Sequence, residues 1–141
     1  MVSADSSIAV LYEAPQPEEY IQLRALTGLS LKSLDGAKIG LAHSIFAVTL
    51  RQGDKLIGMG RIIGDGGCFY QVVDIAVDPA HQGAGLGKLI MKEITAYLDL
   101  HAAKGAYISL LADVPADQLY KQFGFDYTEP KSLGMYRMIP L

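Results

Sequence analysis

The sequence predicts a mixed α/β protein built around one mostly antiparallel sheet. Its first half reads as strands joined by short turns, and its second half alternates strand, helix, strand and helix. The run QVVDIAV, residues 71–77, is apolar on both faces except at Asp74, which predicts a central strand covered on both sides. With 141 residues, 50% of them hydrophobic and 19% charged, the chain can bury the core of a single domain over residues 1–141.

Hydrophobic periodicity and turn residues divide the chain into elements. Strands are predicted over residues 7–14, 44–51, 55–65, 68–77 and 106–112. Helices are predicted over residues 17–28, 86–103 and 115–123, with Gly28 and Gly124 as stop signals and Pro115 in a first turn. Residues 30–42 are compatible with a short helix broken at Gly36, and residues 125–130 and 133–141 are strand-like.

Composition and charge narrow the function classes. The net charge of -3, with Lys and Arg scattered along the chain, provides no electrostatic footprint for nucleic acid. Cys68 is the only cysteine, so neither an intrachain disulfide nor a thiolate metal cluster can form. The sequence has no signal-peptide pattern and no apolar run near the roughly 20 residues of a membrane span. We therefore expect a cytoplasmic protein without a metal, a membrane or a nucleic-acid partner.

A glycine-rich turn precedes the helix predicted from Leu86. In AVDPAHQGAGLGKLIMKEI, residues 76–94, three glycines fall within five residues. N–H groups at a helix start have no intrahelical partner, and the helix dipole favours an anion there. A Walker-type loop would require glycine in place of Gln82 and a hydroxyl residue in place of Leu89, and the dinucleotide fingerprint would require glycine in place of Lys88. Both nucleotide patterns therefore fail.

A third pattern, Q/R-x-x-G-x-G/A, is matched by Gln82, Gly85 and Gly87. The segment DIAVDPAHQGAGLGKLIMKEI closely resembles the acetyl-CoA loop of the GCN5-related N-acetyltransferase (GNAT) family. A second block, LLADVPADQLYKQFGF, resembles that family's later strand–helix block, which has a tyrosine near the helix end before Gly-Phe. The resemblance covers most of residues 44–128. It implies the GNAT fold, a central, mostly antiparallel mixed sheet flanked by helices on both faces.

The resemblance also implies how acetyl-CoA is bound. Backbone N–H groups of the turn would donate to the pyrophosphate, and glycine permits close approach and positive φ. The preceding strand would run along the pantetheine arm, with one backbone N–H facing the thioester oxygen. The implied cofactor-binding residues are Ile75, Ala76, Val77, Gln82, Gly83, Ala84, Gly85, Leu86, Gly87, Lys88 and Asp113. Many relatives carry asparagine where Asp113 stands, so a helix N-cap ahead of Pro115 is an alternative interpretation.

Catalytic candidates follow from the needs of acyl transfer to an amine. Tyr120 matches the family's catalytic tyrosine, and a phenol that is protonated at neutral pH can donate its proton to the leaving thiolate. The acceptor amine must first lose a proton, and Asp74 is the candidate base because burial makes a carboxylate a stronger proton acceptor. The alternatives are that Asp74 is a structural carboxylate bonded to neighbouring donors, that water relays the proton, or that Asp78 or Glu13 is the base.

The sequence thus predicts an N-acetyltransferase that transfers the acetyl group of acetyl-CoA directly to a primary amine of a small molecule. No metal and no covalent enzyme intermediate are needed. Two alternatives remain: acetylation of a lysine or N-terminus in a protein or peptide, and a non-catalytic acyl-CoA-binding module, which the presence of Tyr120 disfavours. Relatives commonly pair, so a homodimer is the candidate assembly.

Overall fold

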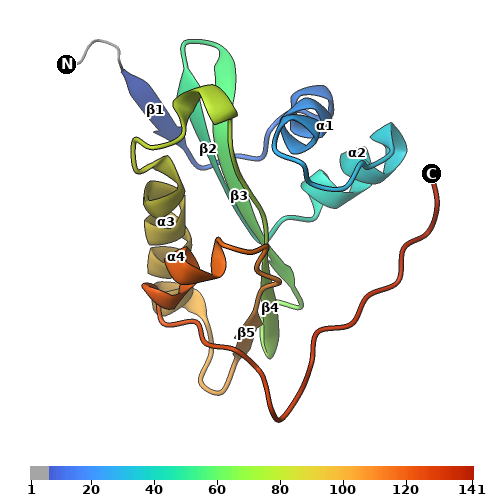
Figure 1. The fold of residues 1–141 in the computed structure, drawn as a ribbon, viewed down its shortest axis with the longest axis vertical. Helices are drawn as coiled ribbons and strands as arrows, with labels where there is room; N and C mark the ends of the chain where they lie inside the picture. The colour runs from blue at the N-terminus through green and yellow to red at the C-terminus, as the bar shows by residue number, and fades with distance from the viewer. Residues whose placement is uncertain (1–6) are drawn as a thin grey trace.

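A five-stranded sheet with helices on both faces forms the centre of the computed structural model, which describes residues 7–141 (Figure 1). The sheet order is β1-β2-β3-β4-β5; the first four strands pair antiparallel, and β5 pairs parallel with β4. The elements in chain order are β1 (Ile8–Leu11), α1 (Pro17–Leu26), α2 (Leu34–Ala42), β2 (Phe46–Gln52), β3 (Lys55–Gly64), β4 (Phe69–Val77), the 3-10 turn η1 (Pro79–His81), α3 (Leu86–His101), β5 (Tyr107–Ser109) and α4 (Asp117–Lys121). The predicted mixed, mostly antiparallel fold is confirmed.

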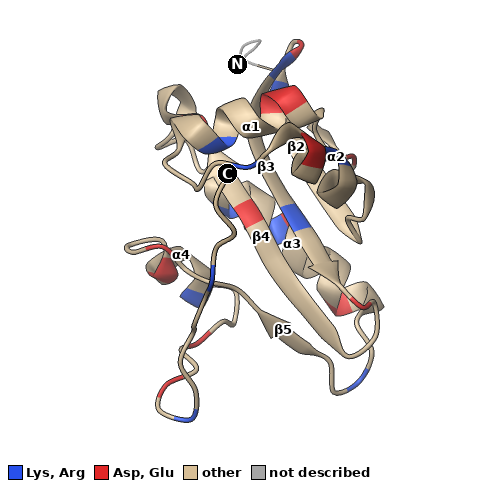
Figure 2. Cartoon of the chain, turned by 90° about the vertical axis from the view of Figure 1, so that its right-hand side faces the viewer, with Lys and Arg blue, Asp and Glu red and all other residues tan. Residues whose placement is uncertain are grey.

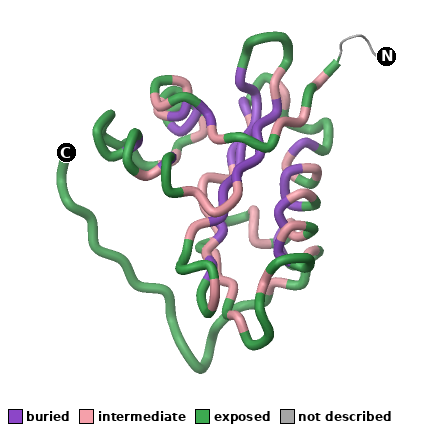
Figure 3. Tube along the Cα trace, turned by 180° about the vertical axis from the view of Figure 1, so that it is seen from behind, coloured by how far each residue is buried: buried purple, intermediate pink, exposed green. Residues whose placement is uncertain are grey.

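The two faces of the sheet carry separate hydrophobic clusters. Helices α3 and α4 cover one face, and α1 and α2 cover the other (Figure 1). Figure 3 shows the buried residues running along the middle strands and one side of α3. The α3-side cluster is built on Val48, Leu50, Ile57, Ile62, Tyr70, Val72, Leu86, Ile90, Met91, Ile94, Leu98 and Tyr120. The α1-side cluster is built on Tyr20, Leu23, Ala37, Leu41, Leu56, Met59 and Ala76.

Helix α3 packs directly against the backbone of β3 at Gly60. A Cβ atom at this position would lie 2.7 Å from both Ile75 Cδ1 and Ile90 Cγ2, which is closer than side-chain carbons approach one another. The apolar residues of α3 recur at three- and four-residue spacing, so one side of the helix is buried on the sheet. Glycine at position 60 therefore sets how closely this helix approaches the sheet.

Strand β4 contains a bulge at its only charged residue. The register shift relative to β3 leaves Asp74 and Ile75 together opposite Gly60, and Asp74 has a φ of 62°. Two residues four apart in a regular strand share a face, yet Val72 belongs to the α3-side cluster and Ala76 to the α1-side cluster. The bulge thus exchanges the two faces of the strand before its last three residues.

Two predicted strands at the end of the chain are wrong. Residues 125–130 and 133–141 form no strand, although much of this segment is extended. Alternation of apolar residues predicts a strand only where a neighbouring strand supplies hydrogen bonds, and the free edge of β5 pairs with neither segment in residues 7–141.

Helix boundaries differ from the prediction at two places. Helix α2 is not broken at Gly36, because that residue lies in the first turn and its N–H donates to Ser33 Oγ at 3.0 Å. Helix α4 is shorter than predicted: its N-cap is Ala116, so Pro115 precedes the helix instead of lying in its first turn. Asp113 is therefore not the N-cap, and that interpretation is wrong.

Candidate functional site

The glycine-rich turn before α3 presents a row of unpaired backbone donors. Gly83 and Gly85 have φ of 87° and 80°, a region that residues with a Cβ rarely adopt. A Cβ at either position would meet nothing within 4 Å, so the outer side of the turn is open. The first hydrogen bond of α3 runs from Leu89 N–H to Gly85 O at 3.0 Å, and the N–H groups of residues 83–88 have no acceptor within the described chain. The turn is therefore suited to an anion such as a phosphate.

A cavity of about 380 Å³ lies beside this turn. Its other walls are the last residues of β4 and one side of α4, and Gln82 Nε2 ties the turn to β4 by donating to Val77 O at 3.2 Å. Every predicted cofactor-binding residue except Ala84 and Asp113 lines it, and sequence reasoning missed Leu119 on α4 and Ala116, the N-cap of that helix. The full lining is Ile75, Ala76, Val77, Gln82, Gly83, Gly85, Leu86, Gly87, Lys88, Ala116, Leu119 and Tyr120.

Strands β4 and β5 separate after a short paired section. They pair only from Phe69 to Gln71 on β4, so the rest of β4 as far as Val77 has no β5 partner. The main-chain groups on this edge of Ile75, Ala76 and Val77 therefore face the cavity side of the sheet without a neighbouring strand. Free backbone donors and acceptors of this kind can bind the amide groups of an extended ligand.

Tyr120 lines three cavities, those of about 380, 420 and 60 Å³. It is 9% exposed and lies on α4 against the α3-side core. Its hydroxyl has no hydrogen-bond partner among residues 7–141. Burial, and then the negative charge of Asp113, raise the pKa of Tyr120 above its ordinary value. The phenol is therefore protonated at neutral pH and available as a proton donor.

The smallest of these cavities, about 60 Å³, lies between β4 and the segment that follows β5. It shares Ile75 and Tyr120 with the cavity at the glycine-rich turn, and both Asp74 and Asp113 line it. The Asp113 side chain is exposed and makes no hydrogen bond or ion pair with other described residues. The structure thus brings Asp113 to the small cavity and leaves it out of the cavity at the turn.

Asp74 is the centre of a buried charge cluster. Its Oδ1 pairs with Arg24 Nη1, and its Oδ2 accepts from Arg61 Nε at 2.7 Å and from Tyr20 Oη at 3.0 Å. The Asp74 side chain is 4% exposed and each arginine side chain 8%. Figure 2 shows basic and acidic positions meeting in the middle of the sheet on β3 and β4. With both oxygens engaged by guanidinium groups, this geometry favours the interpretation of Asp74 as a structural carboxylate.

The two arginines that pair with Asp74 were missed by sequence reasoning. Arg24 Nε donates to Ser30 O at 2.9 Å, and Arg61 Nη1 donates to Gly40 O at 3.0 Å. The cluster consequently joins α1, α2, β3 and β4. A signal was available, because a carboxylate in an apolar strand requires a buried cation and the chain contains few arginines.

The other candidate bases lie outside these cavities. Asp78 caps η1 by accepting from Ala80 N–H at 2.9 Å and lies 3.5 Å from Lys55 Nζ. The Ala80 N–H and the Lys55 charge hold the pKa of Asp78 below its ordinary value, which makes it a weaker base. Glu13 is exposed and lines none of the cavities described here.

Two further findings concern residues 7–141 as a whole. Within that part of the chain, no three His, Cys, Asp or Glu side chains are grouped as metal ligands. None of its helices is both long and apolar enough to cross a membrane.

Comparison with known proteins identifies relatives of the chain. The family model for the acetyltransferase (GNAT) domain matches residues 42–127. The N-acetyltransferase ycf52 of Porphyra purpurea, itself described as uncharacterized, is 31% identical over 122 residues, which cover 84% of this chain and 69% of the relative. A crystal structure of a protein from methicillin-resistant Staphylococcus aureus, described as a probable acetyltransferase, is 47% identical, with a TM-score of 0.91 over 94% of this chain and 100% of that one.

A more distant structure has the same fold. It is a GNAT family acetyltransferase from Brucella melitensis in complex with acetyl-CoA, which is 20% identical, with a TM-score of 0.61 over 86% of this chain and 84% of that one.

Proposed function

The chain belongs to the GNAT family of N-acetyltransferases, and we propose that it transfers the acetyl group of acetyl-CoA directly to a primary amine of a small molecule. The observation that carries this proposal is the position of Tyr120, which lines both the cavity at the glycine-rich turn and the small cavity that contains Asp113. One side chain can therefore reach the donor and the acceptor of a single transfer.

The cavity at the turn fits the donor. The unpaired N–H groups of residues 83–88 would donate to the pyrophosphate oxygens, and Gly83 and Gly85 keep the outer side of the turn free for them. The unpaired edge of residues 75–77 would bind the amide groups of the pantetheine arm. When bound, acetyl-CoA supplies an acetyl group that is activated as a thioester.

Tyr120 is proposed as the general acid. Its hydroxyl is free of internal hydrogen bonds, and its raised pKa keeps the proton in place until the thiolate leaves. The amine nitrogen would form a bond to the acetyl carbon, the C–S bond would break, and the leaving sulfur would take the proton of Tyr120 Oη, which solvent then replaces. The backbone next to the bulge at Asp74 would hold the thioester in position, because the buried cluster fixes that part of β4.

The small cavity is proposed to receive the amine. Of the two carboxylates that line it, Asp74 is neutralised by Arg24 and Arg61, whereas the charge of Asp113 has no internal partner. Asp113 would attract an ammonium group and accept its proton, directly or through water, so that the neutral amine can attack. The cavity volume of about 60 Å³ favours the end of a small, unbranched amine.

The test is release of CoA thiol from acetyl-CoA in the presence of a panel of small primary amines and of lysine peptides. We expect turnover with small amines, and we expect Tyr120→Phe to lower kcat by about 100-fold or more while CoA affinity is unchanged. Tyr12→Phe is the matched control, because the Tyr12 hydroxyl donates to Glu93 at 2.8 Å on the surface, away from the cavities.

Each alternative predicts a different result in the same assay. Faster turnover of lysine peptides than of small amines would favour the protein-modifying alternative. CoA binding without turnover of any acceptor would favour a non-catalytic acyl-CoA-binding module. Failure to bind CoA would refute the assignment of the glycine-rich turn.

A further inference from the structure

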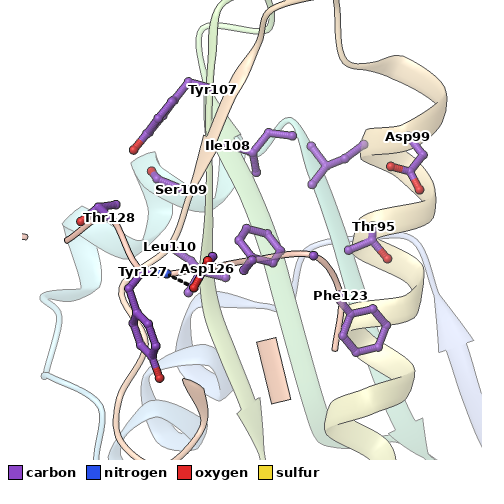
Figure 4. Close-up of a pocket in the computed structure, with 13 residues that line it drawn as sticks. Thr95, Asp99, Tyr107, Ile108, Ser109, Leu110, Phe123, Asp126, Tyr127 and Thr128 are labelled. Carbon is purple, nitrogen blue, oxygen red and sulfur yellow. Dashed lines mark hydrogen bonds between the residues drawn. The ribbon is translucent and has the colours of Figure 1, made fainter. Parts of the chain in front are cut away.

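The small cavity, of about 60 Å³, has one wall that comes from the segment between α1 and α2. In this α1–α2 segment, residues 27–33, Leu29 lines the cavity, and the other lining residues belong to β4, α4 and the segment after β5. A larger cavity of about 580 Å³ is bounded by α3, β5 and residues 123–128, and Figure 4 shows side chains of α3 and β5 around it. The α1–α2 segment does not reach that larger cavity, so its contact through Leu29 is with the small one.

The end of α1 determines where Leu29 lies. Gly28 follows the helix with a φ of 79°, its N–H donates to Ala25 O at 3.3 Å, and the Leu29 N–H donates to Arg24 O at 2.9 Å. These two bonds form the Schellman motif, in which the residue after the glycine commonly packs back on the helix. Leu29 is half-buried and packs against the α1-side cluster. Its backbone therefore has a defined position relative to Arg24.

The side chain of Arg24 joins the same segment to the bulge of β4. Its Nε donates to Ser30 O at 2.9 Å and its Nη2 to Ser30 Oγ at 3.0 Å, while its Nη1 pairs with Asp74 Oδ1. Arg24 is 6% exposed, and all three of its guanidinium nitrogens are engaged. Two of them hold the residue next to Leu29, and the third holds the bulge, where Asp74 lines the same cavity as Leu29. A lysine could not make these contacts together, because it offers a single nitrogen.

We propose that Arg24 is a positioning residue for the amine: it holds Leu29 at a set distance from the bulge of β4, and Leu29 limits the width of the amine that enters the small cavity. This inference rests on the proposed function, which assigns the small cavity to the acceptor. A methylene group more or less in a fitted apolar pocket changes selectivity by about 10- to 200-fold. In a cavity of about 60 Å³, the position of one wall therefore decides between unbranched and branched amines.

The test compares kcat/KM for n-propylamine with kcat/KM for isobutylamine, which carries one additional methyl group. Leu29→Ala widens the cavity and should lower the preference for n-propylamine by about tenfold. Ser30→Ala removes one of the two contacts between Arg24 and the α1–α2 segment and should lower the preference by about threefold. Arg24→Lys keeps the charge opposite Asp74 and should lower the preference at least as much as Ser30→Ala. CoA affinity should be unchanged in Leu29→Ala and Ser30→Ala, because neither residue lines the cavity at the glycine-rich turn.

Ser44→Ala is the matched control. Ser44 Oγ accepts from Arg61 Nη1 at 2.9 Å, so this variant also removes a serine contact to an arginine of the Asp74 cluster, but Ser44 lines none of the cavities described here. Amide hydrogen exchange at the Leu29 N–H gives a second measurement that does not depend on acetyl transfer. Ser30→Ala should speed this exchange, and Ser44→Ala should change neither the exchange nor the preference.

The outcomes separate this inference from the proposed function. If the unaltered chain acetylates small amines and Leu29→Ala leaves the preference unchanged, Leu29 does not limit the amine, and the inference fails while the proposed function stands. If Ser30→Ala changes neither the exchange at Leu29 nor the preference, or if Ser44→Ala lowers the preference equally, Arg24 does not position Leu29. If the unaltered chain acetylates no small amine, the proposed function fails, and the inference fails with it.

Discussion

The two edges of strand β4 are built differently. Toward β3 and α1, the strand carries a buried carboxylate, Asp74, whose oxygens are engaged by Arg24, Arg61 and Tyr20. Toward β5, the strand is paired over three residues and then borders cavities, with Tyr120 across from it and without an internal hydrogen-bond partner for the phenol. The first edge is complete within the described chain, and the second is not.

This difference separates the part of β4 that is held rigid from the part that is left unpaired. A buried ionic cluster with few exposed atoms cannot move without exposing or unpairing charges, so it holds the bulge of β4 in one conformation. On the opposite edge, the backbone groups of residues 75–77 have no neighbouring strand and the nearby Tyr120 phenol has no internal partner, so these groups are free to contact a ligand. In the proposed mechanism, the buried cluster would therefore hold the backbone of β4 in place, and the unpaired part of β4 would contact the ligand.

The largest expected effect comes from breaking the fixed edge. Asp74→Asn leaves two buried guanidinium groups without their counter-charge, and we expect it to lower the free energy of unfolding by about 3 kcal/mol. Urea denaturation measures this change, with Asp113→Asn as the control because the Asp113 carboxylate has no internal partner. If Asp74→Asn keeps its stability but loses turnover, Asp74 is the base and the structural interpretation is wrong.

A smaller effect is expected at the turn that borders the open edge. Gly85→Ala forces a residue with a Cβ into a backbone conformation with φ of 80°, at a cost of about 1–2 kcal/mol. We expect CoA affinity, measured by calorimetry, to fall by about tenfold because the N–H groups no longer converge. Gly40→Ala is the matched control: a Cβ there also meets nothing within 4 Å, but its φ is not positive. Equal affinities in the two variants would contradict the role of Gly85.

Asp113, the carboxylate without an internal partner, provides a sharper test of whether the small cavity binds the amine. Asp113→Asn removes the charge proposed to attract the amine, and kcat/KM for the amine should fall by about tenfold while CoA affinity is unchanged. Asp54→Asn changes a carboxylate in the turn between β2 and β3, far along the chain from the cavities, and should leave both quantities unchanged. A loss of CoA affinity in Asp113→Asn would instead assign this residue to the pantetheine arm.

The smallest expected effect is at an ion pair that water can reach. Arg51 lowers the pKa of Glu19 through hydrogen bonds to both of its carboxylate oxygens. A lowered folded-state pKa means that this stabilisation is present above the unfolded pKa of about 4.3 and is lost as the pH falls through the folded value. Glu19→Gln should therefore cost less than about 1 kcal/mol at pH 7 and close to nothing at pH 2, as judged from chemical unfolding at both pH values. A constant cost at both pH values would show that the pair acts through packing.

Local patterns were sufficient to predict most elements and the glycine-rich turn, because their signals lie within a few residues of one another. The α3 face, the turn glycines and the helix that carries Tyr120 are of this kind. The partners of Asp74 could not be predicted in the same way, because Arg24 and Arg61 approach it only through the fold. Nor could the lost C-terminal strands: their apolar alternation is real, but a strand also needs an edge to pair with, and that edge is not in the same stretch of sequence.

The absence of a side chain at Gly60 affects the length of ligand that the proposed acetyl-CoA site would accept. This glycine lies opposite the bulge of β4 and beneath α3, the helix whose first turn carries the glycine-rich turn. The spacing between that turn and the bulge is therefore fixed at one point by the absence of a side chain. In the proposed complex, Gly60 would therefore set the distance between the groups that bind the anionic end of the ligand and those that lie next to its reactive end. A side chain at position 60 would change the spacing between the glycine-rich turn and the bulge without itself contacting either end of the ligand.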